Sequence, residues 1–232
     1  MKIAVLNFSG NVGKSTIAKF LLLPRYPEAV HITIETINSD TTNSESTLQL
    51  KGKEVDTIQE QLLINDDVIV DVGASNVEQF INGMKLFAGS IEDFDLFLVP
   101  VTPEKKQQVD TITTVDTLLE MGVEAGKIKI VFNRIQTDMN VTDEFYALIQ
   151  YLKTIDIQVS ADSYIPDSSF FERANITGDT VESILNDDTD YKALIKASES
   201  KAEKLEYAAK VMMPRIALGL KQSLDTVASN VL

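Results

Sequence analysis

The chain has 232 residues, a formal net charge of −14 and a hydrophobic fraction of 44%, which is enough apolar sequence to bury one sizeable core. The acidic balance opposes direct binding to nucleic acid or anionic lipid, because both carry the same sign of charge. The absence of cysteine and the presence of a single histidine exclude disulfides, thiolate metal sites, cysteine nucleophiles and most Ser-His and zinc chemistries.

Apolar runs and helical stretches alternate along the chain. Buried strands are predicted at residues 3–6, 31–34, 67–73, 96–101, 128–132 and 163–166, and helices at 17–22, 55–63, 77–87, 103–121 and 142–155, with a loop at 41–46. The strand runs are continuous in hydrophobicity, which is typical of strands covered on both faces. The sequence therefore predicts an α/β fold, with a mostly parallel sheet and helices on both faces.

From about residue 180 onward the pattern is helical, without strand signals. We find no repeat and no linker, so residues 1–232 are predicted to form a single domain, with residues 180–232 as a helical C-terminal extension. Its basic residues favour either a solvated helix face or a DNA-binding patch: Lys192, Lys196, Lys201, Lys204, Lys210, Arg215 and Lys221. An apolar stripe is predicted to pack on the core or on a partner: Ile216, Leu220, Leu224, Val227 and Val231.

No segment is apolar over a length that a membrane span or a signal-peptide core requires. The tail stripe also lacks the aromatic residues and dense positive face of a membrane-surface helix. We therefore expect a cytoplasmic protein without membrane contact.

Residues 8–16, with the sequence FSGNVGKST, lie between the first predicted strand and the first predicted helix. A small flexible turn at a helix start is how a chain binds a phosphate group, because main-chain N–H groups and the helix dipole point at the anion. In this interpretation Gly10, Asn11, Val12 and Gly13 form the turn, and an exposed Lys14 reaches the terminal phosphates. Ser15 is a candidate Mg²⁺ ligand and Thr16 a further phosphate contact. The usual pattern has glycine where this chain has Phe8.

Chemically suggestive residues follow the predicted strands at their carboxyl ends, where an open parallel sheet binds ligands. Asp71 is a candidate Mg²⁺ ligand, and the Gly73 amide a candidate contact to the terminal phosphate. Glu35 and Asp40 are candidates for orienting the attacking water, while Asn133 and Pro166 are candidates for the base. The alternatives are structural: solvated acids in surface turns, and an asparagine that ends a strand and starts a turn.

At the level of these motifs the chain resembles the ParA/MinD ATPases, which have a deviant Walker A loop. The resemblance rests on residues 7–15, on Asp71-Val72-Gly73-Ala74-Ser75 and on residues 99–104, followed by Asn133-Arg134 and Tyr164-Ile165-Pro166. The short loop and the Glu35-Thr36-Ile37-Asn38 turn are most similar to the StbB-type plasmid-stability ATPases of conjugative plasmids. The resemblance covers roughly residues 1–185.

The resemblance implies a single P-loop ATPase domain that binds ATP or ADP with Mg²⁺. It assigns Lys14, Ser15 and Thr16 to phosphate and metal, Asp71 to support of the metal, and Asn133 to the adenine. Two positions depart from the family pattern. Ser9 stands where the signature lysine is expected, and Ile37 stands where an aspartate positions water, so that Asp40 is the candidate replacement.

The function that follows is an ATP-dependent switch in plasmid stability, partition or positioning. It forms an ATP-dependent homodimer, hydrolyses ATP slowly or with partner stimulation, engages a DNA-binding adaptor, and contacts DNA directly only weakly. One alternative is a catalytically silent nucleotide-binding scaffold, favoured by the departures at Ser9 and Ile37. Another is a small-molecule kinase or synthetase, for which no substrate-side Arg or Asp constellation is apparent.

Overall fold

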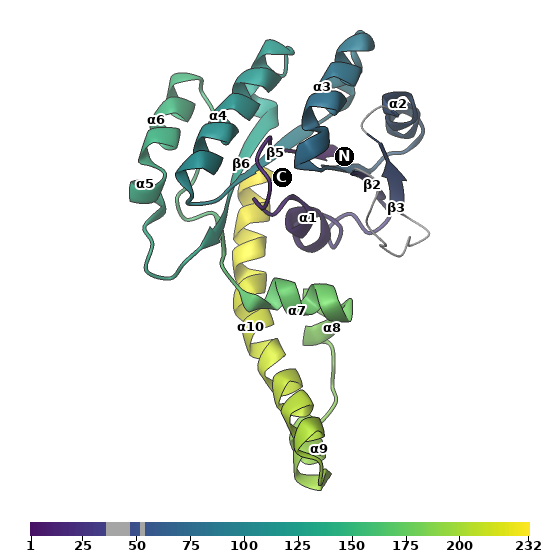
Figure 1. Cartoon of the computed structure of the whole chain (residues 1–232), viewed down its shortest axis with the longest axis vertical. Helices are drawn as coiled ribbons and strands as arrows, with labels where there is room; N and C mark the ends of the chain where they lie inside the picture. The colour runs from purple at the N-terminus through teal and green to yellow at the C-terminus, as the bar shows by residue number, and fades with distance from the viewer. Residues whose placement is uncertain (36–46, 52–53) are drawn as a thin grey trace.

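The computed structural model of the chain describes residues 1–35, 47–51 and 54–232. Its centre is a sheet (Figure 1) of seven strands. The strands are β1 (Lys2–Val5), β2 (Val30–Ile34), β3 (Thr47–Leu50), β4 (Val68–Val72), β5 (Leu96–Val101), β6 (Ile128–Ile135) and β7 (Tyr164–Pro166), in the spatial order β3-β2-β4-β1-β5-β6-β7. Every neighbouring pair is parallel. The predicted α/β class is confirmed.

Helices cover both faces of this sheet. The elements in chain order are α1 (Lys14–Ile17), which continues as the π-helical η1 (Ala18–Leu22), α2 (Val55–Ile64), η2 (Ala74–Asn76), α3 (Val77–Leu86), η3 (Ser90–Asp93), α4 (Lys105–Glu120), η4 (Ala125–Lys127), α5 (Val141–Glu144), α6 (Tyr146–Thr154), α7 (Ser169–Thr177), α8 (Val181–Leu185), α9 (Tyr191–Ala197) and α10 (Lys201–Val231). Residues from α2, α3, α4 and α6 share one core, and residues from α1, η1, α7, α8 and α10 share the other.

The two cores follow from the pleat of the central strand β1. Ala4 and its neighbour Leu6 belong to the first core, while Ile3 and Val5 belong to the second, because successive side chains of a strand point to opposite faces. Since both faces are covered by helices, each of these positions must be apolar. This is why the strand reads as a continuous hydrophobic run.

Several elements differ from those that the sequence predicts. The edge strand β3 was not predicted, because its alternating sequence Thr-Leu-Gln-Leu is only four residues long and directly follows a polar run. The helix predicted over 142–155 is two helices, α5 and α6, which meet at Phe145, where the ring packs 4.7 Å from that of Phe132. Helix α7 was not predicted, whereas the tail is helical as predicted and consists of α8, α9 and α10.

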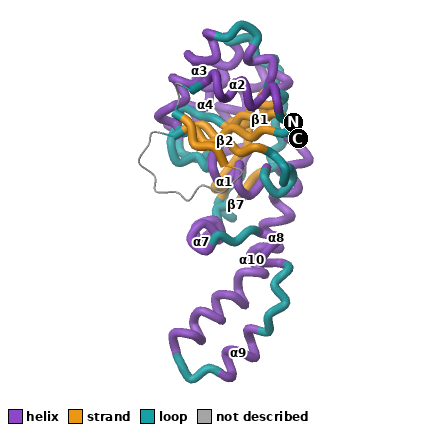
Figure 2. Tube along the Cα trace, turned by 90° about the vertical axis from the view of Figure 1, so that its right-hand side faces the viewer, coloured by secondary structure: helices purple, strands orange, loops and turns teal. Residues whose placement is uncertain are grey.

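The C-terminal half of α10 packs on the sheet, whereas its N-terminal half and α9 extend away from it as a helical hairpin (Figure 2). Leu220, Leu224, Val227 and Val231 are buried in the second core, so the predicted packing of the apolar stripe is confirmed. Pro214 lies inside α10, which continues through it. No helix in the described part of the chain is both long and apolar enough to cross a membrane.

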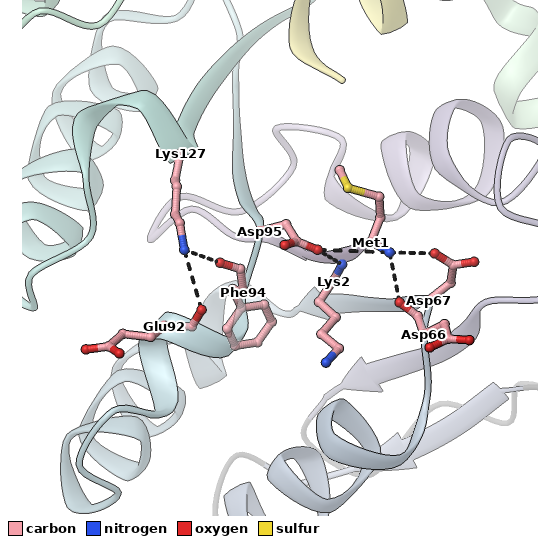
Figure 3. Close-up of polar contacts among 8 residues, drawn as sticks. All are labelled: Met1, Lys2, Asp66, Asp67, Glu92, Phe94, Asp95 and Lys127. Atoms are coloured by element: carbon pink, nitrogen blue, oxygen red, sulfur yellow. Dashed lines mark hydrogen bonds and ion pairs between the residues drawn. The ribbon is translucent and has the colours of Figure 1, made fainter.

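Polar contacts join the strands at the edge opposite the predicted site (Figure 3). The Met1 amino group donates to the Asp66 carbonyl at 2.8 Å and pairs with Asp67 at 2.6 Å, and the Lys2 amide donates to Asp95 at 2.7 Å. Lys127 Nζ donates to the Phe94 carbonyl at 2.8 Å. These contacts hold the starts of β1, β4, β5 and β6 in register.

Candidate functional site

The turn between β1 and α1 has the backbone shape that an anion-binding loop needs. Asn11 and Gly13 have positive φ values of 59° and 92°, and α1 begins immediately afterwards at Lys14. A Cβ atom on Gly13 would lie 2.0 Å from the Nδ2 atom of Asn133, and that same nitrogen donates to the Val12 carbonyl at 2.8 Å. The buried side chain of Asn133 therefore holds this loop in place through its bond to Val12.

Gly13→Ala is expected to lower the free energy of unfolding by roughly 2–4 kcal/mol, because alanine is strained at this φ and its methyl group displaces Asn133. Gly10→Ala is the matched control, since a Cβ at Gly10 meets nothing within 4 Å. Urea denaturation of both variants measures the difference. Equal stability of the two variants would contradict this packing.

Asn7 fixes the start of the loop to the neighbouring strand and helix. Its Nδ2 donates to the Pro100 carbonyl of β5 and to Thr111 Oγ1 of α4, each at 2.8 Å, and its Oδ1 accepts from the Ser9 amide at 2.7 Å. All of these groups are buried, so the bonds are shielded from water. Sequence reasoning missed this role, although an asparagine directly after a buried strand is a signal for it.

Lys14 lies inside the loop rather than exposed as predicted; only 7% of its surface is accessible. Its Nζ donates to the Ser9 carbonyl at 2.8 Å and to the Asn7 carbonyl at 3.3 Å. Burial lowers the pKa of Lys14 to about 8, against the opposing effect of the nearby Asp71 carboxylate. The ammonium group is thus partly desolvated, which strengthens its attraction for an anion.

Asp71 is the most deeply buried carboxylate among the predicted site residues, with 2% of its surface accessible. It accepts a hydrogen bond from Ser15, and its Oδ1 has no hydrogen-bond partner within the described residues. Burial raises the pKa of Asp71 to about 6, the Ser15 bond and Lys14 lower it, and Glu35 raises it further. A buried carboxylate oxygen without a partner beside a serine hydroxyl is a donor set that fits Mg²⁺.

The two shifted pKa values make a prediction about stability and pH in metal-free buffer. Folding raises the Asp71 pKa, so the folded chain holds this proton more tightly and loses stability as the pH rises from about 4 to about 6. Folding lowers the Lys14 pKa, so stability is regained only above about pH 8. Asp71→Asn removes this pH-dependent loss. Its free energy of unfolding should therefore gain on the order of 3 kcal/mol relative to the wild type as the pH rises from 4 to 7, measured by urea denaturation. A difference that does not vary with pH would contradict the burial of an ionisable Asp71.

The residues at the predicted water-orienting positions are placed only in part. Glu35 directly follows β2, close enough to Asp71 to raise its pKa, whereas Ile37 and Asp40 lie outside the described residues. The Gly73 amide, which was predicted to contact the terminal phosphate, donates to the Ile34 carbonyl at 2.9 Å. A Cβ on Gly73 would approach that oxygen to 2.9 Å, so the position requires glycine for the close approach of the two strands.

Asn133 and Pro166 lie at the carboxyl ends of β6 and β7 and line one cavity of about 380 Å³ together with Thr16. The Asn133 side chain is buried and its Nδ2 is bonded to the loop, so its predicted contact to the adenine stays a prediction. Arg134 lies at a register shift between β6 and β7, with φ 57°, and lines this cavity and a second one of about 430 Å³.

Asp167 lines both cavities as well. Sequence reasoning missed Arg134 and Asp167 as separate site residues. The sequence did contain a signal for them: Arg134 directly follows Asn133 and Asp167 directly follows Pro166, and both preceding residues were predicted to contact the base.

No protein-family model and no curated protein sequence matches this chain. Among solved structures, it is similar to an ATP complex of a McdA variant from Cyanothece (TM-score 0.53, 15% identity, 97% of this chain and 96% of that one). It is also similar to the cell division ATPase MinD from Pyrococcus furiosus (0.51, 14%, 91% and 98%) and a ParA family ATPase from Chlorobium tepidum (0.50, 16%, 90% and 97%). The chain therefore has the fold of the ParA/MinD P-loop ATPases over nearly its whole length.

Proposed function

We propose that the chain is an ATP-dependent switch of the ParA/MinD kind that acts in partition or positioning, in plasmid stability as its most specific form. The observation that supports the proposal most strongly is that Lys14, Ser15 and Asp71 lie close together at the turn between β1 and α1. The partly desolvated ammonium group of Lys14 is near the buried carboxylate of Asp71. The similarity to an ATP complex with the same fold supports ATP as the ligand.

Each residue has a definite task in this proposal. The main-chain amides of residues 10–16 bind the phosphates at the start of α1, and Lys14 exchanges its bonds to the Ser9 and Asn7 carbonyls for bonds to phosphate oxygens. Ser15 and Asp71 are the residues that would hold Mg²⁺, which when bound neutralises charge on the phosphates. The cavity lined by Asn133, Arg134 and Pro166 receives the base.

In this proposal Glu35 or Asp40 orients the attacking water. Glu35→Gln should reduce ATP turnover at least about tenfold if its carboxylate orients the attacking water, and should prolong the ATP-bound dimer. The matched variant is Asp40→Asn, tested by the same phosphate-release assay and by size-exclusion chromatography in ATP. Normal turnover in both variants would mean that neither acid positions the water.

The partners follow from charge and from the switch mechanism. ATP closes two copies face to face, and the closed form engages a DNA-bound adaptor protein. With a net charge of −14 the chain itself contacts duplex DNA weakly, through the lysines of the tail, and salt weakens this contact steeply.

The second candidate is a nucleotide-binding scaffold without hydrolysis, favoured by Ser9 and Ile37 at positions where the family has Lys and Asp. Phosphate release measured with and without duplex DNA, together with sizing in ATP, separates the two. Release above the background of Lys14→Ala, with an ATP-dependent dimer, supports the switch. Tight ATP binding without any release in either condition supports the scaffold.

A further inference from the structure

One face of the projecting part of α10 combines exposed apolar and basic side chains. At 3.6 residues per turn, residues spaced by three, four and seven positions share a face. This arm face consists of Lys201, Lys204, Leu205, Ala208, Met212 and Arg215. Leu205 and Met212 are 65% and 50% exposed and lie two turns apart on this face.

The acids of this segment lie on the other side of the helix, where α9 packs. Glu203 accepts a hydrogen bond from Ser198 just after α9, and the ring of Tyr207 lies 6.1 Å from that of Tyr191 on α9. Residues 191–215 hold six Lys or Arg against three Glu, in a chain with 21 basic and 35 acidic residues. Three of these six basic residues, Lys201, Lys204 and Arg215, belong to the arm face, whereas Lys192 and Lys196 lie on α9 and Lys210 pairs with Asp179.

A groove of complementary character lies at the opposite end of the molecule, between α2 and η3. Its volume is about 470 Å³, and its lining includes the acids Asp56, Glu60 and Asp93 together with the apolar residues Leu63 and Phe87. Leu63 is 71% exposed, and no Lys or Arg is among the described residues that line the groove. The groove therefore presents exposed apolar side chains next to acidic ones, while its buried lining residues, Gln59 and Ser90, are polar.

We propose that the arm face of one copy docks into the α2–η3 groove of a second copy. Leu205 and Met212 would bury against Leu63 and Phe87, and the lysines would pair with the acids at the border. A chain cannot make this contact with itself, since α9 and helix α2, which lines the groove, lie at opposite ends of the structure (Figures 1 and 2).

The contact is heterologous, because each copy contributes a different surface to it. Every docked pair leaves one arm face and one groove available, so association proceeds to rings or to longer chains. A second copy fits the arm face better than a polyanion does, because the groove matches both its charge and its apolar residues. A nucleic acid backbone would leave Leu205 and Met212 in water.

The first test is sedimentation velocity of the full chain without nucleotide, over a range of concentrations and at low and high salt. The sedimentation coefficient should rise with concentration and fall with salt, because the border pairs are solvent-exposed. Leu205→Glu should weaken association at least about tenfold, since it places a charge against the apolar side chains of Leu63 and Phe87. Leu218→Glu is the matched control, because Leu218 is 57% exposed on the same helix but away from the arm face.

The second test exchanges charges. Lys204→Glu alone and Glu60→Lys alone should each weaken association, and mixing the two variants should restore it, since acid then meets base in both contacts. A monomer at every concentration, equal effects of Leu205→Glu and Leu218→Glu, or no restoration on mixing would each overturn the proposal. Binding of duplex DNA through Lys204 without self-association would overturn it too.

This contact is independent of the proposed ATP switch. Lys14→Ala should leave nucleotide-free association unchanged while it removes the ATP-dependent dimer. Loss of either behaviour alone therefore shows which of the two proposals has failed.

Discussion

Lys14→Ala is expected to reduce the affinity for MgATP by about 100-fold or more, because charge-assisted bonds to phosphate are lost at a desolvated position. The fold should persist, since burial of this ammonium opposes folding near neutral pH rather than supporting it. Titration with a fluorescent ATP analogue measures the affinity, and thermal unfolding checks the fold.

Lys105→Ala is the control for Lys14→Ala. Lys105 is 74% exposed and pairs with Glu144 at the surface, so its loss removes the same charge without touching the loop. An unchanged affinity in Lys14→Ala, or an equal loss in both variants, would remove the phosphate-loop interpretation.

Asp71→Asn is expected to weaken nucleotide binding about 10- to 100-fold when Mg²⁺ is present and less than about threefold when it is absent. The reason is that the carboxylate acts through the ion: the substitution removes its negative charge and replaces one of its two oxygens with an amide nitrogen that does not ligate Mg²⁺. Parallel titrations in Mg²⁺ and in chelator measure both values.

Ser15→Ala gives an independent check on the metal site, since Ser15 is the hydrogen-bond partner of Asp71 and the second proposed ligand. It should show the same dependence on Mg²⁺ as Asp71→Asn. A loss of equal size with and without Mg²⁺ in both variants would indicate that this pair is structural.

The sheet could be predicted from the sequence because its central strands are buried on both faces. The run Val68-Ile69-Val70 is continuous for that reason, and its end correctly located Asp71 beside the loop. The edge strand β3 escaped prediction, since a half-exposed strand of four residues carries no such run. A local sequence pattern therefore predicts a strand well only where both faces of the strand are buried.

The sequence predicted which types of residue lie at the candidate site, but it did not predict the hydrogen bonds that these residues make. The sequence predicted that Lys14 and Asn133 lie at the carboxyl ends of the strands, where the structure has them, but their bonds join residues distant in the chain or hidden within the loop. Asn133 bonds to Val12 across the loop, and Lys14 turns back onto Ser9. Such contacts depend on how β1 and β6 are placed relative to each other, and this placement is a property of the fold.

The most direct test of the central claim is a crystal structure with Mg²⁺ and a non-hydrolysable ATP analogue. The proposed switch predicts the phosphates on the amides of residues 10–16 with Lys14 turned toward them, the metal beside Ser15 and Asp71, and the base near Asn133 and Pro166. An analogue that binds elsewhere, or a loop that keeps Lys14 on the Ser9 carbonyl at saturating nucleotide, would contradict it.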